Sequence, residues 1–188
     1  MARELGIRKV TFFPSTGDNK YGSPIPLEWA VNLETKNNYK EKEYKGDMKI
    51  ERSTKVLESV DITLGVSSNL PPKVESQITG AEYSHCMKIT KTSTIPVSGA
   101  LAYEIVMDDS KVRRRCLKYC SLAKDEQKND VDSEGEVFTF SGKAISDSLD
   151  NVDILMDQKE VEAASGDSEA KTAWDNFFTK VPTGDYSS

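Results

Sequence analysis

The order of patterns across residues 27–83 restricts the possible fold more than any other feature of this 188-residue sequence. Residues 27–34 alternate between apolar and polar, which predicts a strand of an antiparallel sheet with one buried face. A long charged segment follows at residues 35–52, and a second alternating strand occupies residues 56–66. Residues 71–80 then read as one short helix. This order predicts a mainly β protein, a two-sheet antiparallel β-sandwich or flattened barrel, with one packed helix and a projecting polar arm.

The helix is bounded by residues that favour helix ends. Pro71-Pro72 opens it, where a missing backbone N–H costs nothing, and Gly80 ends it as a C-terminal glycine. Val74 and Ile78 lie one turn apart on a single face. A helix of about three turns is stable only when it packs on a sheet.

The remaining strands are predicted from the same alternation. In the first strand of the 27–83 region we expect one face to carry Leu27, Trp29, Val31 and Leu33. Further strands are expected at residues 7–13, 82–90, 101–107, 112–122 and 137–145, with a weak one at 151–158.

The arm at residues 35–52 has almost nothing to bury. It is either a disordered loop or a segment that becomes ordered against another molecule. Its two tyrosines suit an interface. We therefore assign Tyr39, Tyr44 and Asp47 to a subunit contact.

The C-terminal region is predicted to be an extension of the main domain. Residues 1–160 form the β domain, and residues 161–188 form a linker, read at 161–167, and a short helix capped by Ser168. An aromatic stripe at helical spacing follows, and it either packs on the chain's own core or docks on a neighbour. Its members are Trp174, Phe177, Phe178 and Val181.

Charge is distributed unevenly along the chain. The formal net charge is −6. Residues 1–124 carry 20 basic and 15 acidic side chains, whereas residues 125–188 carry 5 and 16. This balance argues against a basic nucleic-acid binder and suits pairing of the acidic part with the basic part of a neighbour. No apolar run approaches the roughly 20 residues of a membrane span, and the start lacks a secretory signal, so we expect synthesis in a cytoplasm and no membrane partner.

Candidates for chemistry are weak. His85 and Cys86 are neighbours, so on one strand their side chains would face opposite ways, which disfavours a catalytic pair. Cys116 and Cys120 would share one strand face with Arg114 and Lys118, and without further ligands they read as reduced thiols and not as a zinc site. We expect no enzyme activity, no metal and no cofactor.

Two charged motifs remain. Residues 130–135 match the first half of a calcium-binding EF-hand loop, but Ser141 stands at the twelfth position, where the loop needs a bidentate Glu. The Arg113-Arg114-Arg115 run splits its side chains over two strand faces, so salt bridging across a subunit contact is as probable as nucleic-acid binding. We assign Arg113 and Arg115, together with Trp174, Phe177 and Phe178, to subunit interfaces.

The chain resembles the phi13-type major tail proteins of long-tailed phages of Gram-positive bacteria. The resemblance begins with a strand containing Asp61-Ile62-Thr63-Leu64, a Leu70-Pro71 step, the short helix, and an ending formed by Gly80 and Tyr83. It continues in residues 101–119, residues 138–145 and the Trp174-Asp175-Asn176-Phe177-Phe178 segment. Residues 151–166 depart most, being more acidic and less strand-like.

This resemblance implies a tail tube subunit. Six copies would form a ring, and stacked rings would form a hollow tube through which DNA passes without specific binding. Partners would be other copies and tail proteins such as the tape measure, tail terminator and distal tail protein. The location would be the virion tail, after synthesis in the bacterial host cytoplasm. Two alternatives stay open: a tube subunit of a phage-derived bacteriocin or injection device, and a β-sandwich binding module.

Overall fold

The computed structural model describes residues 3–46, 49–67, 69–127, 137–164 and 166–184. Its elements, in chain order, are β1 (Glu4–Gly17), β2 (Lys20–Tyr21), β3 (Ile25–Pro26), β4 (Ala30–Gly46), β5 (Lys49–Ser67), α1 (Pro72–Thr79), β6 (Glu82–Ser84), β7 (Met87–Ile89), β8 (Ser98–Met107), β9 (Val112–Gln127), β10 (Val137–Ala144), β11 (Asp153–Asp157), α2 (Gln158–Ala163) and α3 (Ser168–Asp175).

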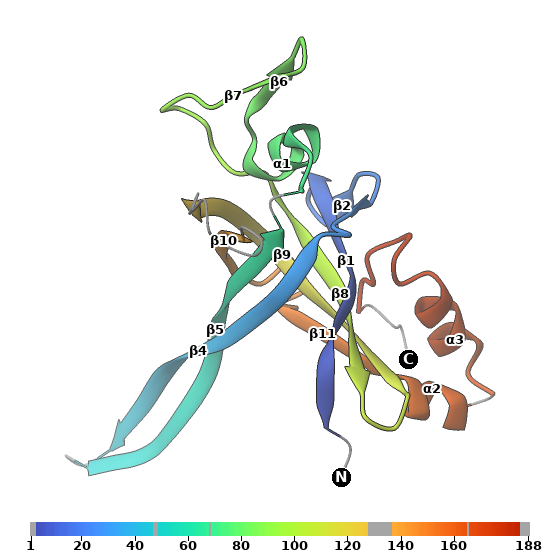
Figure 1. Cartoon of the computed structure of the whole chain (residues 1–188). Coiled ribbons are helices and arrows are strands. Elements are labelled where there is room, and N and C mark those ends of the chain that lie inside the picture. Colours follow the sequence, from blue (N-terminus) through green and yellow to red (C-terminus); the bar gives the residue numbers. More distant parts are fainter. Residues whose placement is uncertain (1–2, 47–48, 68, 128–136, 165, 185–188) are drawn as a thin grey trace.

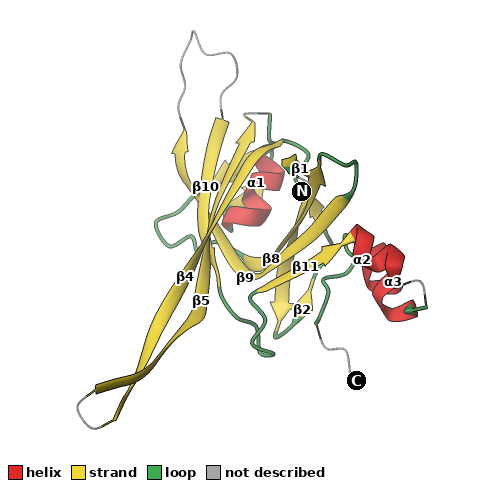
Figure 2. Ribbon diagram, turned by 90° about the horizontal axis from the view of Figure 1, so that it is seen from below, coloured by secondary structure: helices red, strands yellow, loops and turns green. Residues whose placement is uncertain are grey.

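Nine strands form one antiparallel sheet, with the order β2-β1-β8-β9-β10-β5-β4. Strand β3 pairs with β1, and β11 pairs with β9. The sheet curves until β1 and β4 come into contact (Figures 1 and 2). The expected mainly β, antiparallel fold with one packed helix is therefore confirmed, and the main strands belong to a single curved sheet.

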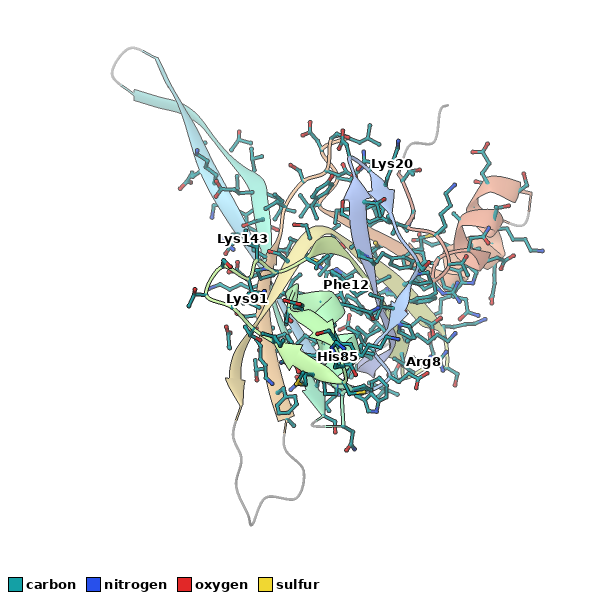
Figure 3. All side chains as sticks on the ribbon, turned by 90° about the horizontal axis from the view of Figure 1, so that it is seen from above. Arg8, Phe12, Lys20, His85, Lys91 and Lys143 are labelled. Atoms are coloured by element: carbon teal, nitrogen blue, oxygen red, sulfur yellow. The ribbon has the colours of Figure 1, made fainter. Side chains whose placement is uncertain are left out.

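The core lies inside this curve. Its apolar side chains come from β1, β5, β8, β9 and β10, and Phe12 points into it (Figure 3). The alternation predicted for residues 101–107 is confirmed, because its four alternating apolar residues all lie in this core. They are Leu101, Tyr103, Ile105 and Met107.

Helix α1 covers one end of the core, as its sequence predicts. Ile78 is buried, and Gly80 adopts a left-handed φ of 73° while its N–H donates to the Ser76 carbonyl. Glu75 of the same helix is buried and pairs with Lys88 at 2.5 Å and Lys124 at 3.2 Å. These ion pairs tie the helix to β7 and β9.

The predicted face of the first arm strand is wrong at Val31. The register between β4 and β5 shifts between Ala30 and Asn32, and this bulge turns Val31 outward to 55% exposure. Leu33 pairs with Leu64 on the core side. A single extra residue reverses the facing of its neighbours, and alternation alone cannot reveal it.

The single strand predicted over residues 82–90 is also wrong. The segment is a hairpin, β6 and β7, that lies at the opposite end of the molecule from the arm (Figure 1). His85 and Cys86 occupy the two turn positions, with positive φ angles of 51° and 62°. Both side chains are exposed, so they do not lie on opposite faces of one strand as expected.

A second bulge separates the two buried cysteines of β9. The register of β8 on β9 shifts between Gly99 and Leu101, and Tyr119 has a φ of 38°. Cys120 therefore faces the main core, whereas Cys116 faces the outer side of the sheet. The expectation that both share one face is wrong; both are free and buried, as expected for reduced thiols.

The C-terminal segment, residues 168–182, packs across the outer side of β1, β8 and β9. It differs from the prediction in two details. Helix α2 occupies part of the predicted linker, and Asp167, not Ser168, caps α3 by accepting from Glu169 and Ala170. Helix α3 ends at Asp175, so the aromatic stripe does not lie on one helix.

Candidate assembly surfaces

The arm is a regular two-stranded ribbon. Strands β4 and β5 stay paired from Ala30 and Val66 to Gly46 and Lys49. Strand β10 supports β5 only over Val60–Ser67, and β4 has no second partner among the described strands. Beyond this supported part the ribbon projects from the body (Figures 1 and 2). A two-stranded ribbon by itself is marginally stable in water, so its open edges favour association with another strand or surface.

The interface residues predicted in the arm are only partly described. Tyr39 is 55% exposed, and its hydroxyl accepts a hydrogen bond from Asn37 at 3.2 Å. The side chain of Tyr44 and the whole of Asp47 lie outside the described part of the structure. The accessible ring of Tyr39 is suited to a contact.

Arg113 and Arg115, the first and last arginines of the run in β9, have acidic partners within the chain. Arg113 donates from Nε to Asp157 at 2.7 Å, and Arg115 pairs with Asp153 at 2.7 Å. The hydrogen bond from Arg113 holds the pKa of the Asp157 carboxyl below its ordinary value. Both acids lie on β11, so these ion pairs fasten that strand to β9. Their role in a subunit contact stays a prediction.

Arg115 also reaches across the inside of the curved sheet. Its NH1 donates to the Thr35 hydroxyl at 3.0 Å and to the Tyr103 hydroxyl at 3.2 Å. It thereby links β4, β8 and β9 beside a groove of about 380 Å³ between the start of β1 and β4. Leu5 and Val31, both largely exposed, line this groove.

Arg114 faces the other way, as predicted, and binds the C-terminal segment. Its guanidinium lies 4.0 Å from the centre of the Trp174 ring and donates to the Trp174 carbonyl. Its Nε also contacts Glu104 at 2.9 Å. Arg8 and Lys9 of β1 pair with the same buried carboxylate at 2.8 and 3.3 Å. Burial raises the pKa of Glu104, but these cations outweigh it and leave the pKa below its ordinary value.

The three predicted aromatic residues differ in burial. Phe177 is fully buried against Ala100, Ala102 and Cys116 on the sheet. Phe178 stacks edge-on against Phe177, with ring centres 5.5 Å apart, and stays partly exposed. Trp174 is also partly exposed. The stripe is therefore anchored within the subunit, and a further contact to a neighbour stays a prediction.

Lys118 is a buried cation that sequence reasoning did not identify. Its side chain is 1% exposed, lies 3.8 Å from the Asp147 carboxylate and donates to the Pro182 carbonyl. Burial lowers its pKa. Asp147 in turn accepts from the backbone N–H groups of Leu149 and Asn151. This cluster anchors the end of the C-terminal segment. The only sequence signal was a lysine in an apolar strand.

The motifs considered for chemistry are not brought together. Residues 130–135 lie outside the described residues. Within the described ranges, no group of three or more His, Cys, Asp and Glu is placed to hold a metal ion. In the same ranges, no helix is long and apolar enough to cross a membrane.

No known protein family and no curated protein matches the sequence. Among solved structures, the chain is similar to the tube-terminating cap of the anti-feeding prophage, with 12% identity over 84% of this chain and 95% of that chain and a TM-score of 0.48. A second similar structure is the sheath–tube complex of the extracellular contractile injection system PVC in its extended state (13% identity, 78% and 88% coverage, TM-score 0.47). A third is the anti-feeding prophage baseplate, 6-fold symmetrised (10% identity, 81% and 94% coverage, TM-score 0.42).

Proposed function

We propose that this protein is a structural subunit that assembles with copies of itself into a tube. The projecting β4–β5 ribbon carries this proposal. A single chain gains little by holding open strand edges away from its body, whereas a polymer covers them at every contact. The exposed Tyr39 ring and the groove beside Leu5 and Val31 add accessible apolar surface that a neighbouring copy would bury.

The finer form of the proposal follows from the sequence resemblance to phi13-type major tail proteins. On that basis, six copies form a ring, and rings stack into the channel through which DNA enters the host. The subunit is then made in the bacterial cytoplasm and resides in the virion tail, joined by other tail proteins. The role is mechanical, without catalysis or a cofactor. In this reading Tyr39, Arg113 and Arg115 lie at or near contacts between copies.

A tube subunit of a phage-derived injection device is the second candidate. The same ribbon and curved sheet serve either particle, because both need a self-stacking ring. The two differ in cargo. Purified particles that contain this subunit together with a packaged genome would indicate a phage tail, and particles without nucleic acid would indicate the device.

Electron microscopy of the concentrated protein tests the proposal. We expect rings or tubes for the full chain. Deletion of residues 37–47 removes the distal part of β4 from the ribbon, and we expect a folded monomer that does not polymerise. Circular dichroism and a thermal melt serve as the folding control. Normal tubes from the deletion variant would show that the arm has no assembly role.

A further inference from the structure

One broad face of the sheet is uncovered in the described structure. The inner side of the sheet is filled by the main core, and the C-terminal segment covers the outer side of β1, β8 and the first half of β9. No described residue of the C-terminal segment covers the outer side of β4, β5, β10 and the second half of β9. Its central residues form what we call the small-polar face: Asn32, Glu34, Lys36, Asp61, Thr63, Gly65, Ser121, Ala123, Thr139, Ser141 and Lys143.

The pairing registers arrange these residues in rows across the strands. One row runs Lys36, Asp61, Lys143 and Ser121. The next runs Glu34, Thr63, Ser141 and Ala123. In a third row, the Asn32 side chain lies over Gly65, where a Cβ atom would collide with it. The exposed Val137 side chain also lies beside Gly65 at this end of the face. Short side chains thus make most of the central surface low, and Val137 borders it.

Charge on the small-polar face is balanced. Its two central rows contain two acidic residues, Glu34 and Asp61, and two basic residues, Lys36 and Lys143, and so carry no net charge. At the edge of the face, the backbone of Glu126 pairs with that of Thr139. Asp61 stands between the two lysines in its row, and Lys143 approaches it at 3.7 Å. Lys143 is seen beside the base of the arm in Figure 3. The whole chain, by contrast, carries a net charge of −6.

These properties do not fit the centre of a protein–protein contact, which is enriched in aromatic residues, Met and Arg. They fit a wall past which a polyanion moves. Each unopposed cation on such a wall would hold a phosphate and release counterions, which adds salt-dependent affinity. Each unopposed anion would repel the passing chain. A balanced row of short polar side chains avoids both effects.

We propose that the small-polar face lines the bore of the assembled tube and presents a charge-balanced wall to the passing DNA. This inference rests on the proposed tube function. It places the C-terminal segment, with α3, on the outside of the tube wall, because that segment covers a different side of the sheet.

Cysteine labelling tests the orientation. The background is Cys86→Ser, because Cys86 is exposed while Cys116 and Cys120 are buried. Ser141→Cys places a thiol on the small-polar face, Thr63→Cys provides a second position there, and Lys171→Cys on the exposed side of α3 is the control. Each variant is treated with a small maleimide and with a maleimide on a long polyethylene glycol chain, before and after assembly.

We expect both reagents to label every variant before assembly. In tubes, the bore positions should keep their reaction with the small maleimide and lose that with the polymer, which cannot travel along the bore. The control at Lys171→Cys should react with both. Polymer labelling of Ser141→Cys and Thr63→Cys in tubes would place the face outside, and loss of both reactions would place it in a subunit contact; either result overturns the inference. Electron microscopy beforehand separates these results from absence of tubes, which would contradict the proposed function itself and the inference with it.

Discussion

Truncation of Phe177 is the sharpest test of how the C-terminal segment is held. The Phe177 ring is fully buried in a cluster that also contains Phe13, Ala100, Ala102 and Cys116 of the sheet. Ala100, Ala102 and Cys116 are too short to fill the space that Phe177→Ala would leave, so the size of the loss depends on how far Phe13 and the β11 side chains can move into it. Such a buried Phe-to-Ala change costs about 3–5 kcal/mol of folding free energy. That total includes the edge-on contact with Phe178, which is worth about 0.5–1.5 kcal/mol.

The loss of folding free energy that Phe177→Ala causes cannot exceed the free energy with which the C-terminal segment docks on the sheet, because the segment can unfold locally. If docking of the C-terminal segment is worth less than the substitution costs, the variant releases the segment and keeps the remaining sheet folded. Arg114 and Lys118 then no longer donate to the carbonyls of Trp174 and Pro182. Urea unfolding followed by tryptophan fluorescence gives the free-energy change, and limited proteolysis reports whether residues 168–182 have become accessible.

Phe178→Ala is the matched control, because Phe178 is only partly buried. It should cost clearly less than Phe177→Ala and leave the segment protected from protease. The joint change of Trp174 and Phe178 to Ala should fall between them, because Phe177 still anchors the segment. Equal losses for Phe177→Ala and Phe178→Ala, with unchanged protease protection, would refute this account of the segment.

Three further predictions follow from the buried and paired charges. Lys118→Met should destabilise the fold by about 3–5 kcal/mol, because it leaves the buried Asp147 without its cation. In urea unfolding, the double variant with Asp147→Asn should recover much of this loss of folding free energy. Failure to recover it would show that Lys118 acts through another contact. Glu104 has a lowered pKa, so its stabilising contribution is complete above the ordinary carboxyl value of about 4 and is lost as the pH falls through the lowered value. The stability difference between the wild type and Glu104→Gln should therefore shrink below about pH 4, and a difference independent of pH would contradict the ion-pair assignment. Asp61→Asn removes the acid that stands between Lys36 and Lys143 in their row and leaves Glu34 as the acid among the named residues of the small-polar face. Tubes of this variant should therefore retain duplex DNA in a salt-sensitive filter-binding assay, whereas wild-type tubes should not. Micromolar, salt-sensitive binding by the wild type would contradict the proposed bore.

Elements with strong local signals could be predicted from the sequence alone. The prolines and Gly80 define α1 because they act through their own backbone geometry, which depends little on the rest of the chain. The alternation at Leu101–Met107 reports which face of β8 is buried, because consecutive strand side chains point to opposite sides. The opposed facing of Arg114 relative to Arg113 and Arg115 follows from the same rule.

Tertiary structure decided the features that interrupt this rule. The bulge after Ala30 exposes Val31, and the bulge near Tyr119 sends Cys116 and Cys120 into different clusters. A bulge depends on the hydrogen bonds of the partner strand, which lies far away in sequence. The turn at His85-Cys86 was missed for a related reason, since neither residue is a strong turn former and the hairpin is positioned against α1 through Lys88 and Glu75.

The aromatic segment shows the same division most clearly. The sequence determined that Trp174, Phe177 and Phe178 must pack on some surface, because removing apolar rings from contact with water is favourable. It did not determine which surface. Only the fold brings Phe13, Ala100, Ala102 and Cys116 into one cluster with Phe177. It also sets Arg114 and Lys118 beside the carbonyls of Trp174 and Pro182. Burial of a side chain is a property of two surfaces, and the second one exists only after distant strands have paired.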